Sequence, residues 1–185
     1  MLRTKPGLVQ GGGREIVIDI LQKFPTFKDC FGLVRSVAAR PAVEVLKLLD
    51  AVIFNVVAGN ADAHGKNFSI LYDAEGPRLA PLYDWLATVA YPDLSPKFAM
   101  KIGKRATLAE LDAKGWKAFA ADAGLGLPLV RRRIGEISKG VLEQATAVAA
   151  ELSRPGLDGT AIERFADMVR DRAERCALTV AGAGQ

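Results

Sequence analysis

The sequence predicts a mainly α domain, a helical bundle that carries one small β-hairpin. Apolar residues recur at spacings of three and four positions through most of the chain, which is the period of a helix. Only one place, near the middle, combines short extended runs with a turn. Half of the 185 residues are hydrophobic and the net charge is only +4, so the chain can bury a core of its own.

The first sixty residues predict an arm followed by three helices. Residues 1–14 have no period and predict an irregular arm, whereas Glu15–Leu21 carries apolar residues at helical spacing. A second helix is expected over Lys28–Ala39. A third begins at Pro41, because proline suits the first turn of a helix, and its wide apolar stripe predicts burial as far as an end near Gly59.

The middle of the chain predicts a hairpin between two polar loops. Phe68–Tyr72 and Arg78–Ala80 are short extended runs, and Asp73–Pro77 between them has the composition of a turn. Asn60–Asn67 comes before this hairpin and Pro81–Trp85 after it, and neither shows a helical or alternating pattern. Both segments are therefore interpreted as loops.

The C-terminal part predicts three further helices, which complete a single domain over residues 15–180. The stretch before them is expected to stay irregular because it contains two prolines and Gly103. Thr107 and Glu110 have the spacing of a capping box, and Asp158 can cap the last helix. The predicted elements are Leu108–Ala123, Pro128 to about Leu152, Gly159–Leu178 and a frayed tail at residues 181–185.

The composition argues against several functional classes. Basic residues are spread along the chain and Arg131–Arg133, the only run, is interpreted as a solvated helix face, so direct nucleic-acid binding is not expected. Cys30 and Cys176 lack paired zinc spacing and are expected to be buried free thiols. No apolar stretch is long enough to cross a membrane and no signal peptide is visible, so the expected location is the cytoplasm.

Polar residues gather in the loop Asn60–Asn67, directly behind a predicted buried helix. Five of its eight residues are polar or charged, and they include His64, the single histidine of the chain. Such a density is costly unless the loop faces a solvent cleft and a ligand. Further along, Asp84 stands alone among apolar and aromatic residues, where a carboxylate needs a partner such as a metal ion.

The spacing of these residues matches the template of a phosphoryl-transfer site. In protein kinases a catalytic Asp precedes a magnesium-binding Asn by five positions, and a second magnesium-binding Asp follows. Asp62 and Asn67 have the same separation, and the hairpin and Asp84 follow in that order. Phosphoryl transfer needs oxygen ligands to hold Mg²⁺ on the phosphates while one Asp orients the hydroxyl, so the order favours this chemistry.

Longer segments around these residues carry a family resemblance. NADAHGKNFSILYD, from Asn60, and RLAPLYDWLATVAYP, from Arg78, resemble the HipA family of bacterial serine/threonine kinases, and FAMKIG, from Phe98, is similar to the same family. The similarity covers residues 12–148. It implies a protein-kinase-like fold of the HipA C-terminal type, ATP and Mg²⁺ as cofactors, phosphorylation of a protein Ser or Thr, and a toxin–antitoxin context.

The resemblance also implies roles for three residues by their place in the motifs. Asp62 matches the catalytic Asp, while Asn67 and Asp84 match the metal ligands and thereby the groups that hold the nucleotide. The alternative for all three is a solvated loop in which an Asp or Asn caps the backbone.

Three neighbouring residues are further candidates. His64 and Lys66 lie within the matched loop and are assigned to the catalytic site, and Tyr83, beside the second metal ligand, is assigned to cofactor binding. The alternatives are a structural hydrogen bond for His64, a solvent-exposed charge for Lys66 and core packing for Tyr83.

The sequence departs from a complete kinase in one respect. A kinase also needs an upstream β-rich lobe with a glycine-rich loop, and Gly11–Gly13 fits neither common phosphate-loop frame. The expectation is therefore a C-terminal lobe without its N-terminal lobe, whether as a piece of a longer protein, a split-gene product or a remnant. The expected partners are a protein substrate and a HipB-like antitoxin or a separate N-terminal lobe, with no membrane.

Two other functions stay open at this point. The first is a catalytically incomplete, kinase-like module that binds or regulates a partner. The second is a metal-dependent hydrolase that uses Asp62, His64 and Asp84.

Overall fold

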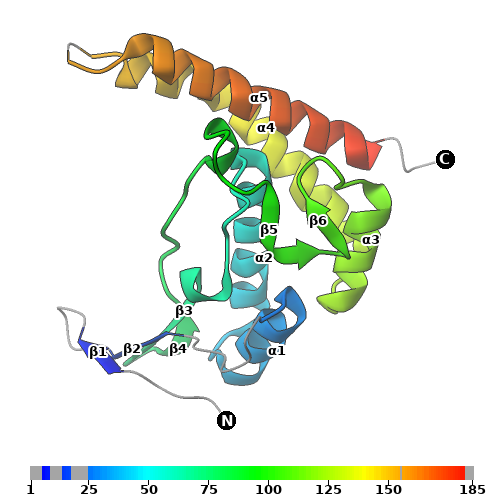
Figure 1. The fold of residues 1–185 in the computed structure, drawn as a ribbon. Coiled ribbons are helices and arrows are strands. Elements are labelled where there is room, and N and C mark those ends of the chain that lie inside the picture. The colour runs from blue at the N-terminus through cyan, green and yellow to red at the C-terminus, as the bar shows by residue number, and fades with distance from the viewer. Residues whose placement is uncertain (1–5, 9–13, 18–24, 155, 182–185) are drawn as a thin grey trace.

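The computed structural model describes residues 6–8, 14–17, 25–154 and 156–181. Its helices are α1 Phe27–Val37, α2 Pro41–Ala58, α3 Ala113–Asp122, α4 Leu127–Leu152 and α5 Gly159–Ala181. Within the described residues helices predominate, so the predicted mainly α fold is confirmed. The central helix α2 runs from a small sheet at one end of the molecule to the long pair α4 and α5 at the other (Figure 1).

The first two helices begin and end at recognisable capping residues. Thr26 and Asp29 form a reciprocal capping box at the start of α1, and Pro41 opens α2. Gly59 ends α2 with φ +82°, the left-handed conformation that favours glycine. The predicted helices over Lys28–Ala39 and from Pro41 to near Gly59 are therefore confirmed.

An antiparallel sheet lies at the N-terminal end of α2. The predicted hairpin is present as its last two strands, and two N-terminal strands extend it in the order β1-β2-β3-β4. The strands are β1 Pro6–Leu8, β2 Arg14–Val17, β3 Ser69–Asp73 and β4 Gly76–Leu79.

The N-terminal predictions are wrong where the structure describes them. Residues 6–8 and 14 are strand rather than irregular arm, and Glu15–Val17 is strand rather than helix. The β-branched Ile16 and Val17 suit a strand, and β3 supplies a partner for the whole length of β2, so sheet pairing outweighs the short helical pattern. The rest of the arm, including Gly11–Gly13, and residues 18–21 of the predicted helix lie outside the described residues.

A completely buried carboxylate joins the sheet to α2. Glu44 accepts a hydrogen bond from the backbone N–H of Leu79 at 3.0 Å and pairs with Lys47 at 2.9 Å. Because both carboxylate oxygens are engaged, the buried charge is compensated. The joint fixes the end of β4 and hence the start of the loop that carries Asp84.

A second hairpin occupies the stretch that was predicted to be irregular. β5 (Lys97–Ile102) pairs with β6 (Arg105–Thr107), and Gly103 and Lys104 form the turn with φ values of +50° and +72°. Two consecutive positive φ values are typical of the turns that match strand twist in hairpins. The prediction is wrong because Gly103 was interpreted as a breaker rather than as a hairpin turn.

The helix after this hairpin starts later than predicted. Asp112, rather than Thr107, caps α3, because its Oδ1 accepts the N–H of Gly115 at 2.7 Å. Thr107 does accept a hydrogen bond from the N–H of Glu110, but the Glu110 carboxylate accepts from the N–H of Ala106. The two residues therefore stabilise a turn that precedes α3.

One core connects these elements. Trp116 and Phe119 are each 1% exposed, and Phe119 makes edge-on ring contacts with Phe27, Phe31 and Trp116 at centroid distances of 5.8, 5.9 and 5.6 Å. Both cysteines are buried and unpaired, as expected. The core therefore joins α1 to α3 beneath the loops of the site.

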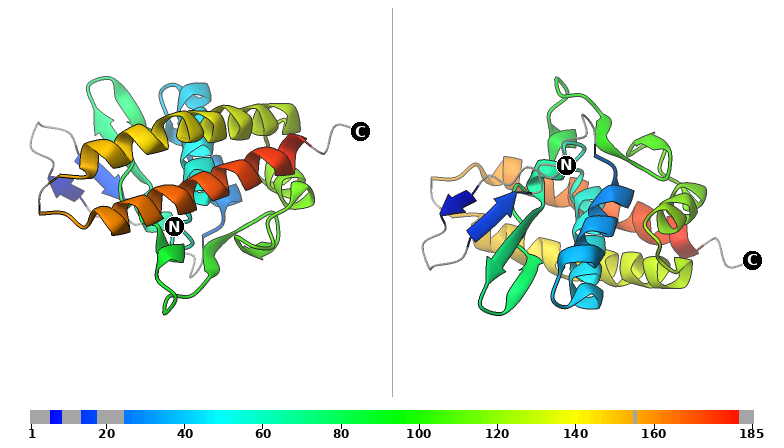
Figure 2. Two further views of the ribbon diagram at one scale, coloured as in Figure 1. Left: turned by 90° about the horizontal axis from the view of Figure 1, so that it is seen from above. Right: turned by 90° about the horizontal axis from the view of Figure 1, so that it is seen from below.

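The long helices α4 and α5 form an antiparallel pair that lies along one side of the molecule (Figure 2). Asp158 accepts the N–H of Ala161 at 3.1 Å, which confirms the predicted cap of α5, although this helix runs on to Ala181. The structure describes no helix with the length and apolar character needed to cross a membrane.

Candidate active site

The polar loop begins where α2 must stop. The left-handed Gly59 turns the chain out of the helix, and a side chain there would meet the side chain of Val89 at 2.4 Å. The loop then runs back along α2 to a single 3-10 turn, η1 (Gly65–Asn67), and enters β3 (Figure 1). The predicted loop Asn60–Asn67 therefore includes this turn.

Backbone contacts hold the first part of the loop on two sides. Thr88, in the short 3-10 turn η2 (Thr88–Ala90), accepts the N–H of Ala61 at 2.8 Å and donates to the carbonyl of Gly59 at 3.1 Å. On the other side, Ala99 of β5 donates to the carbonyl of Ala61 at 2.8 Å. The loop is fixed at its base, while the side chain of Asp62 is exposed.

The structure brings Asn67 and Asp84 together. The Asn67 side-chain amide donates to a carboxylate oxygen of Asp84 at 2.6 Å, although the residues lie on different loops. Asn67 is 6% exposed, whereas Asp84 is exposed and has a positive φ of +63°. The bond leaves the Oδ1 atom of each side chain available to a ligand.

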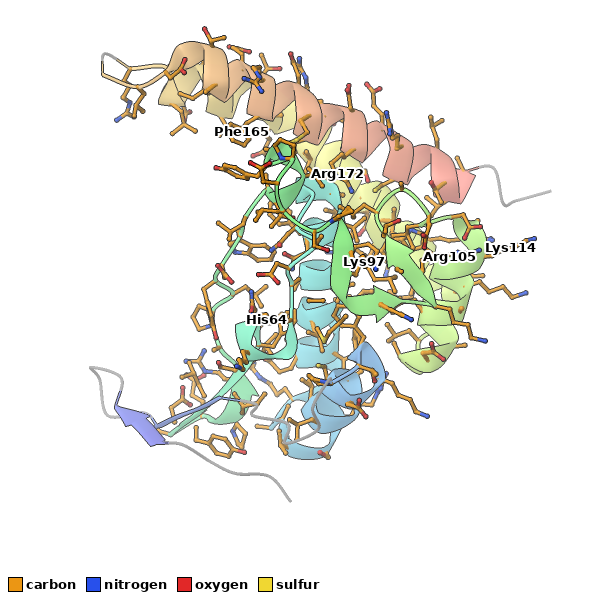
Figure 3. The ribbon with its side chains drawn as sticks, in the orientation of Figure 1. His64, Lys97, Arg105, Lys114, Phe165 and Arg172 are labelled. Atoms are coloured by element: carbon orange, nitrogen blue, oxygen red, sulfur yellow. The ribbon has the colours of Figure 1, made fainter. Side chains whose placement is uncertain are left out.

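The three other candidates have different surroundings. His64 is half-buried next to η1 (Figure 3), and its Nδ1 has no hydrogen-bond partner among the described residues. Lys66 has an exposed side chain. The Tyr83 hydroxyl donates to the carbonyl of Lys66 at 2.6 Å and lies 3.2 Å from the hydroxyl of Ser69, so it ties the second loop to the first.

One residue of the site was missed by sequence reasoning. Asn60 is 2% exposed, and its side chain bonds to Asn55 of α2, to the Asp62 N–H and to the Asp84 carbonyl. Asn60 is the first polar residue after a predicted buried helix, and this position could have marked it as a site candidate. Its bond to Asp84, 24 residues further on, could not be predicted from the spacing of residues.

The donor atoms of Asn67 and Asp84 fit a magnesium ion. Mg²⁺ takes oxygen ligands, commonly one or two carboxylates with several waters, and an exposed carboxylate beside an amide oxygen offers this. Among the described residues, no group of three or more His, Cys, Asp or Glu side chains could hold a metal. The acidic cluster that would favour the hydrolase alternative is therefore not found in the part of the chain that the structure describes.

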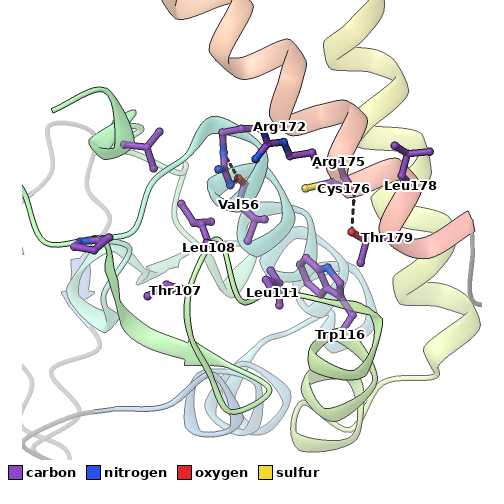
Figure 4. A pocket seen from close by; sticks show the side chains of 13 residues that line it. Val56, Thr107, Leu108, Leu111, Trp116, Arg172, Arg175, Cys176, Leu178 and Thr179 are labelled. Carbon is purple, nitrogen blue, oxygen red and sulfur yellow. Dashed lines mark hydrogen bonds between the residues drawn. The ribbon is translucent and has the colours of Figure 1, made fainter. Parts of the chain in front are cut away.

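An arginine from the last helix reaches the start of this loop from behind. The Arg172 guanidinium of α5 donates to the carbonyl of Val56, with Nε at 3.0 Å, as Figure 4 shows. Burial lowers the pKa of Arg172 below its ordinary value, yet its charge lies favourably against the C-terminal end of α2. It also lines a pocket of about 620 Å³ bordered by Leu108, Leu111 and Trp116, to which no candidate site residue contributes.

The fold and the site define a member of one family. A family model described as the HipA-like C-terminal domain matches residues 18–149, and the chain belongs to this family. The protein named "Putative kinase Y4mE" of Sinorhizobium fredii is 62% identical over 156 residues, which are 84% of this chain and 37% of that protein. The "Serine/threonine-protein kinase toxin HipA" of Shewanella oneidensis is 35% identical over 104 residues, 53% of this chain and 23% of that protein.

A solved structure shows the same fold. A chain from the complex of the Shewanella oneidensis MR-1 toxin–antitoxin system HipA, HipB and its operator DNA superposes with a TM-score of 0.80 at 23% identity. The match covers 95% of this chain and 40% of that chain. In each of these three matches, this chain therefore spans 40% or less of the length of the other protein.

Proposed function

We propose that this chain is the C-terminal catalytic lobe of a HipA-like serine/threonine kinase. The observation that carries the proposal is the side-chain bond between Asn67 and Asp84, together with the exposed carboxylate of Asp62 in the same loop as Asn67. This bond joins the two loops, and the three residues follow one another along the chain in the order of the kinase template. The relatives named as kinases support the same activity.

Each residue has a distinct task in this proposal. Asn67 and Asp84 would hold Mg²⁺, which neutralises phosphate charge when it is bound. Asp62 accepts the proton of a substrate Ser or Thr hydroxyl and aims its oxygen at the γ-phosphate of ATP. His64 and Lys66 lie close enough along the loop to contact phosphates or substrate, and the exposed ring of Tyr83 can contact the nucleotide while its hydroxyl stays bound to the loop.

The test replaces Asp62 with Asn in a form of the protein that carries both kinase lobes. The amide keeps the volume and removes the charge, so phosphate transfer from labelled ATP should fall about 10²–10⁴-fold, the usual worth of a general base. Binding of ATP should persist, because Asp62 is not assigned to the nucleotide.

The matched control is Asp122→Asn, the same chemical change at an exposed residue at the end of α3, which contributes no residue to the proposed site. It should leave transfer unchanged. Equal rates for Asp62→Asn and the parent protein, with both folded by thermal melting, would remove Asp62 from the mechanism.

The names of the relatives also suggest a partner. We propose that a HipB-like antitoxin binds the complete protein, because the solved structure with this fold is a complex of HipA with HipB and operator DNA. Co-expression with the product of the adjacent gene, followed by size-exclusion chromatography, tests this. Separate elution of the two proteins would count against it.

A binding role without catalysis is the second candidate, and one observation favours it. The segment 83–94 exposes many large apolar side chains beside the site: Tyr83, Trp85, Leu86, Val89, Tyr91 and Leu94 are 37–56% exposed. Such a surface is typical of a contact with another protein unit. Retained partner binding by an Asp62→Asn protein, with no phosphate transfer by the parent, would favour this candidate.

A further inference from the structure

The side chain of Asn60 has a partner for each of its polar atoms. Its Nδ2 donates to Asn55 Oδ1 at 2.8 Å and to the carbonyl of Asp84 at 3.1 Å, and its Oδ1 accepts the N–H of Asp62 at 3.0 Å. Asn60 is 2% exposed, so these bonds are sheltered from water. Buried polar groups that are fully paired specify one arrangement of their surroundings.

The three partners come from three segments, two of which carry the proposed chemistry. Asn55 lies in α2, Asp62 is the proposed base, and Asp84 is the proposed metal ligand on the loop after the hairpin. A residue that only ended the helix would bond to the helix. Asn60 bonds to the helix through Asn55, and its one planar amide also bonds to the backbone of both carboxylate-bearing residues.

The backbone of Asp84 gives an independent reason to expect such a support. Its φ of +63° lies in the left-handed region, which costs energy for a residue other than glycine and persists where neighbouring contacts over-determine it. The bond from Asn60 to the Asp84 carbonyl is one such contact, and the bond from Asn67 to its carboxylate is another.

We infer that Asn60 is a positioning residue that fixes Asp84 relative to Asp62, so that the metal and the substrate hydroxyl meet in one geometry. The inference rests on the proposed function for the roles of the two carboxylates. Alanine at position 60 loses all three bonds. Aspartate keeps an acceptor for the Asp62 N–H but loses the donor to Asn55 and to Asp84, so this variant tests the donor bonds alone.

The test uses the chain itself and Mn²⁺ as a paramagnetic substitute for Mg²⁺, observed by nuclear magnetic resonance. In the parent chain, Mn²⁺ should broaden the backbone resonances of Asn67 and Asp84 first. Asn60→Ala and Asn60→Asp should weaken this affinity about tenfold to a hundredfold, the usual effect of removing a group that orients a metal ligand.

A control separates positioning from general destabilisation. Ile134→Ala removes a completely buried side chain of α4, which contributes nothing to the two loops, and lowers the melting temperature through a cavity. Its Mn²⁺ affinity should equal that of the parent. Parent-like affinity in both Asn60 variants, or an equal loss in Ile134→Ala, would overturn the inference.

A measurement without metal distinguishes this inference from the proposed function. In Asn60→Ala the Asp62 amide should exchange with solvent faster and the Asp84 backbone shifts should move, while Ile134→Ala leaves both unchanged. If Mn²⁺ does not affect Asn67 and Asp84 in the parent chain, the proposed metal site fails. The placement by Asn60 is then judged on the metal-free data, and unchanged exchange and shifts would refute it.

Discussion

At the scale of single residues, Asp84 combines a costly backbone conformation with an exposed carboxylate. A left-handed φ costs on the order of 1–3 kcal/mol for a non-glycine residue, although Asp tolerates it better than most. The structure offsets this cost with bonds from Asn60 and Asn67. Backbone strain of this kind is common at ligand sites where a side chain is held in its binding orientation in advance. This agrees with the metal-binding role that we propose for Asp84.

A buried thiol predicts a pH dependence of stability. Cys30 is 0% exposed, and burial, aided by Asp29, raises its pKa from 9.0 to about 12. The unfolded chain loses this proton from about pH 9 upward, while the folded chain keeps it. The free energy of unfolding should therefore be unaffected by this thiol below about pH 8 and fall by on the order of 2–4 kcal/mol between pH 9 and pH 12.

Urea denaturation of the parent chain and of Cys30→Ala across this pH range measures the effect. The variant starts less stable because of its cavity, but its stability should fall less steeply with pH. Burial also raises the pKa of Cys176, so part of the slope should remain. Parallel curves for the two proteins would contradict the prediction.

The residues to which we assign the chemistry could be found from the sequence more easily than those that support them. Asp62, Asn67 and Asp84 follow the spacing of the kinase template, and a spacing can be recognised in the sequence alone. Asn60 and the hydroxyl of Tyr83 act on partners in another loop. The packing of the two loops determines these partners, and this packing cannot be predicted from the spacing of residues.

At the scale of elements, the hairpin β5–β6 and the helix α3 depend on one glycine. A β-carbon at Gly103 would lie 1.9 Å from the backbone oxygen of Gly115 and 2.6 Å from the backbone nitrogen of Phe119. Backbone atoms of a helix cannot yield as a flexible side chain does. The close approach explains why the chain uses glycine at this turn.

We predict that Gly103→Ala destabilises the protein by about 2–5 kcal/mol, since it combines an unfavourable positive φ with a clash against α3. The control is Gly135→Ala in the middle of α4, where no atom lies within 4 Å of the new β-carbon. That variant should be more stable than the parent by about 0.5–1 kcal/mol, because alanine favours a helix interior. Thermal unfolding measures both, and a Gly103→Ala protein as stable as the parent would refute the steric argument.

Elements with long apolar stripes were predicted well, and short ones were not. The helix from Pro41 has many buried positions, α4 has a proline in its first turn, and α5 begins at the Asp158 cap, so each helix carries a signal that its sequence shows. Glu15–Val17 is too short for its period to distinguish a helix from a strand, and its strand partner β3 lies far along the chain. Pairing between distant segments decided the outcome.

At the scale of the whole molecule, α2 and α5 fix the site from behind. The core holds α2 in place, Arg172 of α5 bonds to the carbonyl of Val56 near the end of α2, and the loop begins four residues later. The site therefore sits on a rigid support on one side and opens to solvent at Asp62 and Asp84 on the other. A kinase closes that open side with a second lobe, whose glycine-rich loop covers the nucleotide.

The affinity of the 185-residue chain for nucleotide should be low. Among the residues that the structure describes, the groups that we assign to ATP are a metal held by Asn67 and Asp84 and a few loop atoms. We therefore predict that the 185-residue chain binds Mg²⁺–ATP only with a millimolar or weaker Kd, about −4 kcal/mol or less favourable. A resonance titration with Mg²⁺–ATP measures the affinity, and the shifts should centre on residues 62–67 and 84.

Two controls decide whether such weak binding occurs at the proposed site. Omitting Mg²⁺, or replacing Asp84 with Asn, should abolish the shifts, because both remove the proposed link between the chain and the phosphates. Micromolar binding by calorimetry would contradict the prediction, since it would require nucleotide contacts beyond these loops. If Asp84→Asn instead binds Mg²⁺–ATP with the same millimolar Kd as the parent, Asp84 does not hold the metal. Other groups would then bind the phosphates.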